Sequence, residues 1–533
     1  MAPGKKSDDE IASAVMSREC FDVGTVEMLD DRTNREFYGD SITASYRLKS
    51  ELVGQCMDEI GMGTFQWLLF IVAGFGGMID NFWSQGIGTV QLPVAAEFAD
   101  VTRVTFSSIA YNAGLICGAS FWGISADFIG RKPAFNLTLL IGGIFGVAVG
   151  GVDSFIPFCV MWALIGSAAG GNVPVDNMLF LEFLPSSHQW LLTALSTWWI
   201  MGQLIVSLVG WVFIANFSCA TDSPPGTCSK EDNMGWRYTM YVLGGLTLAF
   251  SFIRIALFKM PESPRYLLSK NRDEEAVEAV NYVARRNGRP EPLTLVMLQQ
   301  IDNTLGAVVS PNKGGRGGLS TKQILQENLA DFKTANFKSM FATRRLAQHT
   351  TVTWLIWLII GIAYPLYFNF LPTYLAHRFT ENRSLDKTYR DYCIQSAVGT
   401  VGPFVAAILI QTRLGRRYVI AISAVATGVF LFSYTAVRTP AANLALSSIT
   451  GLVGNLEYAT LFAFTPESFP APYRGLGSGF ASTLLRFGGL SASLIGTYTN
   501  FTAVPIYVAA TMWIGAGLLS CLLPFETHDH AAI

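Results

Sequence analysis

The chain has 533 residues, of which 51% are hydrophobic and only 14% are charged, and its mean hydropathy is +0.37. Soluble domains carry about 25% charged residues, so this composition excludes a string of globular domains and indicates a polytopic membrane protein. The formal net charge of -2 and the lack of a long basic run exclude nucleic-acid binding.

The sequence lacks the motifs of common enzyme classes. Its eight cysteines form no CxxC pair, and no HExxH or Cys/His cluster indicates a metal site. A GxxxxGK[ST] phosphate loop and a GxSxG nucleophile elbow are also missing. We therefore expect neither an enzyme nor an ATP-driven pump, and we expect no cofactor.

Residues 1–62 form a polar N-terminal tail without the apolar core of a signal peptide, and we expect it to stay in the cytosol. Two blocks of apolar runs follow, at 63–258 and 346–524, and each run can cross about 30 Å of hydrocarbon as a helix. The first block predicts spans at 64–94, 104–126, 135–152, 155–181, 191–215 and 239–257. The second block predicts spans at 346–376, 392–412, 418–437, 441–464, 476–498 and 502–523. The predicted fold class is an all-α membrane protein with twelve transmembrane helices.

The stretch 259–345 between the blocks is too polar to span a membrane and predicts a cytosolic linker. Within it, 273–286 begins with acids and ends with bases, as a surface helix does, and 320–323 fits the capping box of another helix. Short loops rich in Lys and Arg indicate the cytosolic side of the membrane. Both termini, including the tail at 525–533, are therefore expected in the cytosol.

An internal repeat relates the two blocks. One shift of 285 residues (415 minus 130) aligns three separate features of the sequence. It places Gly130 and Arg131 on Gly415 and Arg416, Gly166 on Gly451, and Glu182 with Pro185 on Glu467 with Pro470. The blocks are thus predicted to be pseudo-symmetric six-helix halves, as in many secondary transporters, which bind substrate near the midplane between the halves.

Several motifs carry a family resemblance. The stretch 123–132 (GISADFIGRK) resembles the loop motif of the major facilitator superfamily, and 261–265 (PESPR) and 466–470 (PESFP) resemble its sugar-porter-like branch. The stretches 170–176 (GGNVPVD) and 363–366 (AYPL) are similar to the fungal group related to synaptic vesicle proteins. The resemblance covers all twelve spans and implies a transporter of that fold.

In this family, charged residues at the cytosolic ends of the helices form a breakable latch for the outward-facing state. The resemblance implies such a gate from Asp127, Arg131, Lys132, Glu182, Glu262, Arg265, Arg416, Glu467 and Arg474. These charges could alternatively serve only to set topology. The chain departs from the family pattern at Gln189 and Trp190, and it has Trp162 where sugar porters carry an arginine in the fourth helix.

Four ionisable residues stand out inside predicted spans: Asp80, Asp176, Glu457 and Arg486. A charge at the bilayer centre costs about 2.5 to 3.5 kcal/mol, so each is a candidate functional residue. Asp80 matches the first-helix acid of related proton symporters and is our candidate for proton coupling. It could instead be a permanent partner of Arg486, and Arg486 could bind an anionic substrate or neutralise Asp80 or Glu457.

Polar and aromatic side chains of the expected cavity helices complete the candidate site. They are Trp83, Gln85, Trp199, Gln203, Tyr364, Tyr367, Asn369 and Asn455, together with Asp176, Glu457 and Arg486. An aromatic stripe can equally be packing. The glutamine pair of sugar porters (QQxSG) has no match at 354–361, so a hexose is not favoured.

The outward loops offer two kinds of covalent modification. Cys219 and Cys228 are nine residues apart, and an oxidising compartment would permit either a disulfide or two thiols. Asn216 and Asn382 begin glycosylation sequons.

From these observations we expect a monomeric secondary transporter of a small organic solute, an organic acid or ion rather than a hexose, coupled to protons. The alternatives are an exporter of a secondary metabolite, a uniporter, or a receptor of the same fold that does not transport. The plasma membrane is the expected location, with a vacuolar or vesicle membrane as the alternative.

Overall fold

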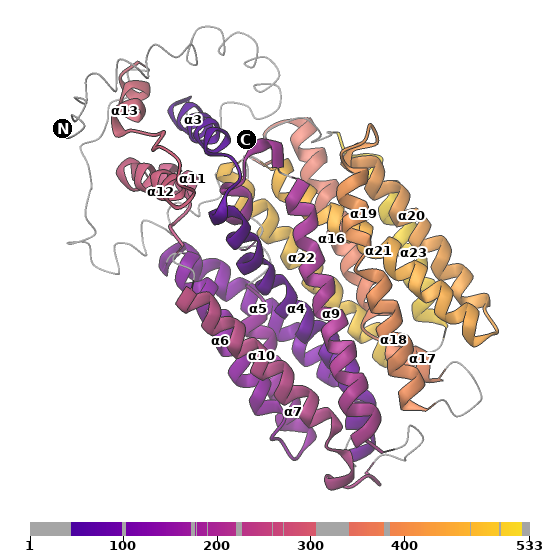
Figure 1. Ribbon diagram of the computed structural model, residues 1–533. Coiled ribbons are helices and arrows are strands. Elements are labelled where there is room, and N and C mark those ends of the chain that lie inside the picture. The colour runs from indigo at the N-terminus through magenta and orange to yellow at the C-terminus, as the bar shows by residue number, and fades with distance from the viewer. Residues whose placement is uncertain are drawn as a thin grey trace.

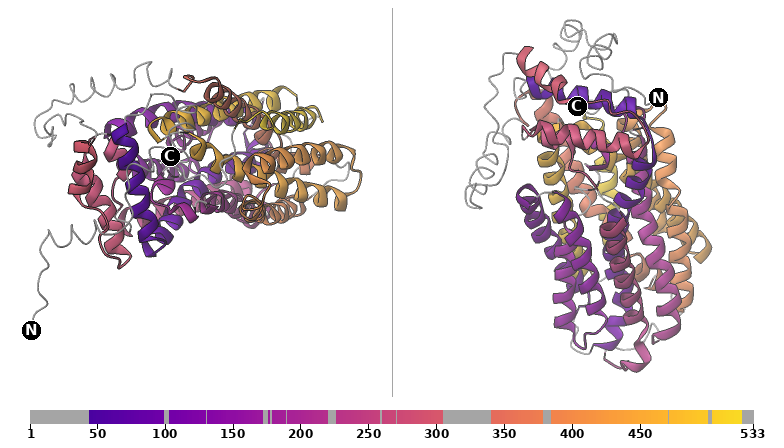
Figure 2. Two further views of the ribbon diagram at one scale, coloured as in Figure 1. Left: turned by 90° about the horizontal axis from the view of Figure 1, so that it is seen from above. Right: turned by 60° about the vertical axis from the view of Figure 1, so that its left-hand side comes forward.

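The computed structural model describes residues 44–98, 103–129, 131–171, 176, 179–188, 190–219, 226–257, 260–269, 271–304, 340–377, 384–469, 471–499 and 503–524, and the regular secondary structure in these ranges is helical. The long helices run side by side as one elongated bundle, with four shorter helices at one end (Figures 1 and 2). The fold class is therefore the all-helical one predicted from composition.

The N-terminal half of the bundle consists of α4 (Thr64–Glu97), α5 (Phe106–Ile129), α6 (Arg131–Val149), α7 (Phe155–Ala169), α9 (Trp190–Phe217) and α10 (Gly235–Leu257). The C-terminal half consists of α16 (Arg344–Phe368), α17 (Leu371–His377), α18 (Leu385–Gly399), α19 (Gly402–Leu409), α20 (Gly415–Ala436), α21 (Pro440–Ser468), α22 (Ala471–Tyr498) and α23 (Val504–Ser520). Each predicted span corresponds to one of these helices or to a consecutive pair. Six segments are by themselves long and apolar enough to cross a membrane, at 64–97, 186–217, 235–256, 344–368, 385–409 and 415–436.

Two predicted spans differ from the structure in where the helix begins or is interrupted. The span at 346–376 is broken at Asn369 and Phe370 into α16 and α17, downstream of Pro365, which cannot donate a backbone hydrogen bond. The span predicted to begin at 392 begins at Leu385 instead, because the hydroxyl of Ser384 caps the helix by accepting from the backbone N–H of Lys387 at 3.4 Å. The first turns of this helix are polar, so a search for apolar runs does not detect them.

The glycines of the internal repeat occupy equivalent contacts in the two halves. A Cβ on Gly166 would meet the backbone of Tyr111 in α5, and a Cβ on Gly451 would meet the amide of Gln395 in α18. Gly415 has a φ of +64°, which only glycine adopts cheaply, where the chain turns into α20. The shift of 285 residues seen in the sequence thus corresponds to matching helix contacts.

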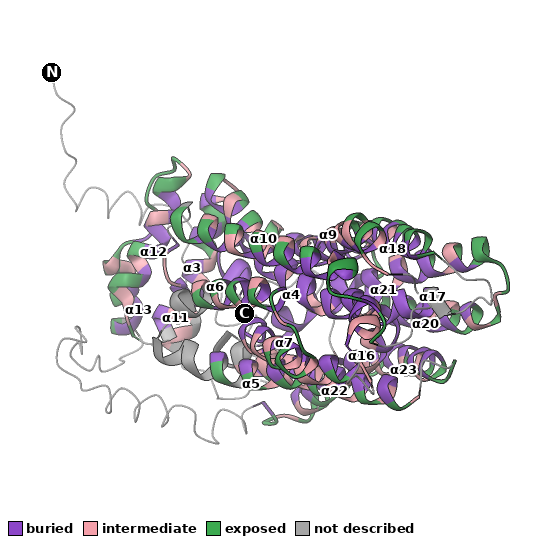
Figure 3. Ribbon diagram, turned by 90° about the horizontal axis from the view of Figure 1, so that it is seen from below, coloured by how far each residue is buried: buried purple, intermediate pink, exposed green. Residues whose placement is uncertain are grey.

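Large apolar side chains cover the outside of the bundle. Ile156, Phe252 and Leu518 are 77%, 72% and 63% exposed. Seen from below, exposed residues lie along the outer sides of the helices and buried residues lie toward the middle (Figure 3). Such a surface is stable in lipid and would aggregate in water, so the bundle is an integral membrane protein.

Four shorter helices, which we call the cap helices, lie beyond one end of the bundle: α3 (Ala44–Ile60), α11 (Pro264–Ser269), α12 (Asp273–Arg286) and α13 (Leu295–Thr304) (Figure 1). We call this end of the bundle the cap end and the opposite end the distal end. The sequence predicted α12, whereas α3 lies in a stretch that we described only as a polar tail. The second linker helix, predicted near 320–323, lies outside the described residues.

The cap helices share a small apolar core and a buried charge cluster. Val53 and Met57 of α3 belong to the same cluster of buried apolar residues as Val280 of α12. Lys49, which is 6% exposed, lies between Asp273 at 2.5 Å and Asp302 at 2.6 Å. Burial alone would lower the pKa of Lys49, but the hydrogen bonds and charges of the two aspartates outweigh it and raise the pKa above its ordinary value of 10.5. Lys49 therefore remains charged at neutral pH, and its stabilising contribution is lost only as the pH rises through this raised pKa.

Replacement of Lys49 by methionine is expected to loosen α3 by about 2 kcal/mol, because two charged hydrogen bonds are lost and two acids are left facing each other. Hydrogen–deuterium exchange of the α3 amides measures this opening. Arg272→Met serves as the matched control, since it removes only the more exposed pair between Arg272 and Glu275. Equal protection of α3 in both variants would contradict the role given to Lys49.

Candidate substrate site

Asp80 lies in the middle of α4 at the centre of the bundle. Within the described part of the chain, its Oδ1 atom is buried and has no hydrogen-bond partner. Its carboxylate interacts electrostatically with Arg486 of α22 and faces the indole of Trp199 on α9. A first-helix acid of one half thus lies within electrostatic range of a cation of the other half, but the two form no direct ion pair or hydrogen bond among the described residues.

Arg486 is buried, at 6% exposed, and donates from Nη2 to the carbonyl oxygen of Gly170 at 2.6 Å. Gly170 follows α7, so this hydrogen bond also joins the two halves. The arginine that sugar porters carry in the fourth helix is Trp162 here, and Trp162 packs in an aromatic cluster with Trp83, Tyr111 and Phe158. The cation that acts electrostatically on Asp80 therefore belongs to the opposite half of the molecule.

Asp176 is paired with Arg254 of α10 inside the N-terminal half. The distance from Asp176 Oδ1 to Arg254 Nη2 is 2.7 Å, and the two side chains are 3% and 1% exposed. A Cβ at Gly76 of α4 would overlap Asp176, so only glycine leaves room for the pair. Sequence analysis missed Arg254, although a lone charge in the predicted span 239–257 was a signal that could have found it.

Aromatic rings from both halves form one cluster beside Asp80. The ring of Trp199 lies 4.7 Å from that of Tyr458 and 5.4 Å from that of Tyr364, measured between centroids. Tyr364 in turn stacks on Tyr458 at 5.0 Å and on Phe368 at 4.4 Å. Trp199 and Tyr364 were predicted cavity residues, and the structure brings them together with Tyr458.

Amides and tyrosines join the halves between the aromatic cluster and the distal end. Gln85 donates to Asn369 at 3.1 Å and accepts from the hydroxyl of Tyr392 at 3.0 Å. Gln203 donates to Gln395 at 3.2 Å. Gln85, Gln203 and Asn369 were predicted cavity residues, and here they close the distal side of the site.

A second set of contacts joins α5 and α22 nearer the distal end. Asn112 donates to Ser493 at 3.1 Å, and Thr497 donates to Thr105 at 2.8 Å. The two halves are thus hydrogen-bonded from the level of Arg486 to the distal end of the bundle.

The remaining predicted cavity residues lie inside one half. Trp83 is fully buried against Trp162 and beside Gly146. Tyr367 packs against Phe368 and Tyr434 within the C-terminal half. Asn455 accepts from the hydroxyl of Tyr364 at 3.3 Å. The carboxyl of Glu457 is fully buried, and neither of its oxygens has a hydrogen-bond partner among the residues described.

Part of the predicted charge gate is visible at the cap end. Arg416 forms a two-point contact with Glu467, with Nε at 2.6 Å from Oε2 and Nη2 at 2.9 Å from Oε1, and both side chains are buried. Glu182 is also buried, whereas Glu262 and Arg265 are partly exposed. The side chains of Asp127, Arg131, Lys132 and Arg474 lie outside the described residues.

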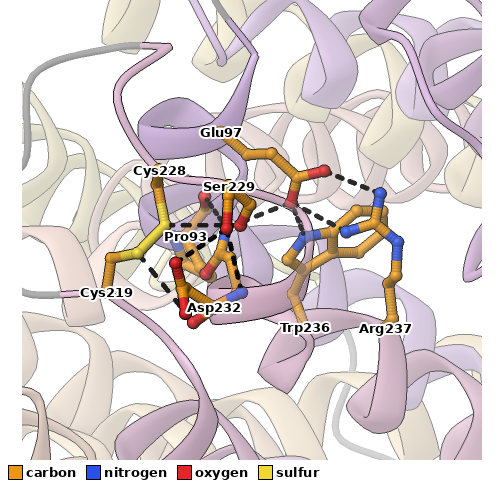
Figure 4. Close-up of a disulfide and its surroundings, with 9 residues drawn as sticks. Pro93, Glu97, Cys219, Cys228, Ser229, Asp232, Trp236 and Arg237 are labelled. Atoms are coloured by element: carbon orange, nitrogen blue, oxygen red, sulfur yellow. Dashed lines mark hydrogen bonds and ion pairs between the residues drawn. A yellow bond between two sulfur atoms is a disulfide. The ribbon is translucent and has the colours of Figure 1, made fainter.

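The distal end of the N-terminal half carries a buried charge network (Figure 4). Both carboxylate oxygens of Glu97 accept from Arg237 at 2.7 Å, and Trp236 and Asn233 donate to Glu97 at 2.8 and 3.1 Å. A disulfide between Cys219 and Cys228 closes the adjoining loop. The sequence suggested the disulfide as one of two options and missed the Glu97 network.

Only one of the two glycosylation sequons lies in the described part of the chain. Asn216 is exposed near the end of α9, and its side-chain amide donates to the carbonyl oxygen of Val212 at 2.8 Å. Asn382 lies outside the described residues. Glycosylation at both sites stays a prediction.

Comparison with known proteins identifies the family. Residues 67–493 match the model described as Major Facilitator Superfamily. The chain is 62% identical to the major facilitator-type transporter hxnZ of Emericella nidulans, over 96% of this chain and 93% of that protein. It is 42% identical to MFS siderochrome iron transporter 1 of Ceriporiopsis subvermispora, over 92% of each chain. The niacin transporter NiaP of Acinetobacter baylyi is 24% identical, over 86% of this chain and 95% of that protein.

The fold is similar to that of the proton:xylose symporter XylE, with a TM-score of 0.66 at 18% identity, over 88% of this chain and 98% of that one. Synaptic vesicle 2-related proteins are also relatives, which agrees with the motifs at 170–176 and 363–366. The chain belongs to the major facilitator superfamily, and it is a membrane transporter rather than an enzyme.

Proposed function

We propose that the protein is a proton-coupled transporter of small organic acids or ions that works by alternating access. The observation that carries this proposal is that Asp80 of one half lies within electrostatic range of the buried Arg486 of the other half, without a direct ion pair between them. A proton on Asp80 cancels the charge that Arg486 faces, and an anionic substrate can then take the place of that charge. Proton binding and substrate binding would thereby act on the same electrostatic interaction between the halves.

The positions of the contacts between the two halves indicate which side of the site is closed. The cap end carries the linker helices and the pair between Arg416 and Glu467, so we assign it to the cytosol. The hydrogen bonds from Gln85 and Thr497 hold the halves together on the distal side of Asp80. With this orientation the site is closed toward the outside. Rocking of the two halves would open the outer side and close the cytosolic side, where Arg416 and Glu467 lie.

The proposed substrate class rests on the charges of the site. The names of the relatives do not agree on a substrate, since one names niacin and another siderochrome iron. Arg486 offers a planar cation that suits a carboxylate. The amide of Gln85 is already satisfied between the halves, since it donates to Asn369 and accepts from Tyr392. These features favour an organic anion over a hexose, which needs several free hydrogen-bonding groups.

The test is uptake into proteoliposomes of a panel of labelled organic acids, organic cations and hexoses, with and without an inward proton gradient. We expect organic acids to accumulate only with the gradient and hexoses not to accumulate. Uptake at the same rate with and without the proton gradient would establish a uniporter. Accumulation only under an outward gradient would establish an exporter, and saturable binding without flux would establish a receptor.

A further inference from the structure

A small pocket lies between the two halves on the cap-end side of Asp80. Its lining includes Ala73 and Gly77 of α4, Asp176, Ser196 and Trp199 of α9, and Tyr458 of α21. Its volume of about 20 Å³ suffices for one water molecule and excludes an organic solute. Helix α4 begins at the cap end, so Ala73 and Gly77 lie nearer than Asp80 to the end that we assign to the cytosol. The pocket therefore suits water on the cytosolic side of Asp80.

Three buried polar atoms in or near this pocket have no hydrogen-bond partner among the described residues. They are Oδ2 of Asp176, Oδ1 of Asp80 and Nε1 of Trp199. Asp176 and Trp199 line the pocket, and Asp80 faces the same indole. Buried polar groups cost free energy unless they are hydrogen-bonded, and a buried water with two to four polar neighbours can satisfy them. Two acceptors and one donor are thus placed where water can link them.

Two glycines leave the surface of α4 bare between Asp176 and Asp80. A Cβ on Gly76 would lie 1.7 Å from Oδ2 of Asp176, so this oxygen lies directly against the helix backbone. A Cβ on Gly77 would lie 3.9 Å from Trp199, in ordinary contact. Positions 76, 77 and 80 share one face of α4, because residues three and four apart in a helix are neighbours. The two acids therefore lie along the same face, and the charge of Asp80 acts on Asp176.

The two carboxylate oxygens of Asp176 have different surroundings. Oδ1 accepts from Nη2 of Arg254 at 2.7 Å, whereas Oδ2, which lies against Gly76, accepts from no described residue. A proton can therefore bind to Oδ2 while Arg254 remains hydrogen-bonded to Oδ1. Among the described residues, the charged groups that act on Asp176 are Arg254 of α10 and Asp80 of α4, and Arg486 of α22 acts in turn on Asp80. Asp176 can thus take up and release a proton without giving up its partner.

We infer that Asp176 relays protons between Asp80 and the cytosol through water held in this pocket. The inference rests on the proposed function, in which Asp80 is the coupling site. The carboxyl O–H of Asp80 breaks as its proton passes to the bound water, and the water gives one of its own protons to Oδ2 of Asp176. Asp176 then releases that proton to cytosolic water and returns to a carboxylate beside Arg254. Each O–H bond that breaks is matched by one that forms, and the pocket water is unchanged at the end.

The test follows protonation of Asp80 directly, in the purified full-length transporter in lipid nanodiscs. A flash releases protons from a caged donor, and time-resolved infrared spectroscopy follows the C=O stretch of the protonated carboxyl group. The Asp80→Asn variant assigns this band by its loss. A methyl group on Gly77 would occupy the pocket without a clash. We therefore expect Gly77→Ala to slow the protonation of Asp80 about tenfold while the final amplitude of the band stays the same.

Two further variants locate the effect. Asp176→Asn combined with Arg254→Met removes the relay without leaving one charge buried alone, and we expect the same slowing. Gly245→Ala is the matched control with the wild-type rate, because a Cβ at Gly245 of α10 meets no atom within 4 Å. An unchanged rate in Gly77→Ala and in the double variant, or equal slowing in Gly245→Ala, would overturn the relay. A shifted pH midpoint of the Asp80 band at an unchanged rate would also overturn it, because Asp176 would then only shape the surroundings of Asp80.

The outcomes also distinguish this inference from the proposed function. Gradient-driven uptake of organic acids, together with wild-type protonation rates in Gly77→Ala, would refute the relay and leave proton-coupled transport intact. The expected slowing of Asp80 protonation, without gradient-driven uptake of any acid in the panel, would support the proton route and refute the proposed function. Failure of Asp80 to take up a proton in the wild type would refute both.

Discussion

Replacement of Asp80 by asparagine is expected to abolish proton-driven accumulation of substrate while leaving exchange of substrate across the membrane intact. Asparagine has nearly the shape of protonated aspartate but cannot release a proton, so the interaction with Arg486 would be fixed in its uncharged form. Counterflow needs only the substrate-bound halves to rock, and it does not require a proton to leave. The measurement is uptake into proteoliposomes under an inward proton gradient, compared with counterflow into vesicles preloaded with unlabelled substrate.

Glu457→Gln provides the internal control for this experiment. Glu457 is fully buried inside the C-terminal half, whereas Asp80 is only partly buried and lies within electrostatic range of Arg486 across the halves. We therefore expect Glu457→Gln to retain gradient-driven accumulation. Loss of accumulation in Glu457→Gln together with normal accumulation in Asp80→Asn would move the proton site to the C-terminal half.

Replacement of Glu97 by glutamine is expected to lower the free energy of unfolding by about 3 to 5 kcal/mol, because it leaves the buried guanidinium of Arg237 with only the exposed Asp153, 3.7 Å away, as a counter-charge. Arg237 is 1% exposed, so water cannot compensate for the loss. The drop in thermal midpoint, followed by size-exclusion chromatography of heated detergent-solubilised protein, measures the effect.

Two further variants make this prediction specific to the buried charge. Glu97→Gln combined with Arg237→Met should recover much of the loss, because no charge then remains buried alone. Asp153→Asn should cost little, since Asp153 is 68% exposed, contacts Lys230 at the surface and reaches Arg237 only at 3.7 Å. That hydrogen bond lowers the pKa of Asp153, so the contact persists until the pH falls below the ordinary range of a carboxyl group. A single variant at Glu97 no less stable than Asp153→Asn would contradict the importance of the network.

The sequence predicted the bundle well because its main signal is chemical and local. Apolar runs at 64–94 and 191–215 correspond to α4 and α9, since every backbone group in lipid must be satisfied within a helix. The same signal fails for α3, whose apolar residues are too few and too widely spaced to resemble a span. Helix α3 is stable only because Lys49 and its apolar face meet α12 and α13, which are more than 200 residues away in sequence.

The sequence predicted which residues belong to the candidate site better than it predicted which of them contact each other. Asp80, Asp176 and Arg486 stood out because a charge inside an apolar run is rare. Which charges meet depends on how helices are rotated and on what fills the space between them. The partner of Asp176 is Arg254 because Gly76 leaves the room for it. Position 162, where sugar porters carry an arginine, holds a tryptophan that packs against Trp83, and the cation that acts electrostatically on Asp80 is Arg486.

The ion pairs described above for the bundle lie within single halves, whereas the halves are joined by hydrogen bonds, some of which have one charged partner, as between Arg486 and Gly170. The ion pairs of Glu97, Asp176 and Glu467 each lie within a single half. The contacts of Gln85, Asn112 and Thr497 across the halves are between neutral groups. Dissolved salt weakens attraction between exposed charges but hardly affects neutral hydrogen bonds. The neutral hydrogen bonds between the halves, and the one from the buried Arg486, should therefore weaken little between dilute buffer and brine.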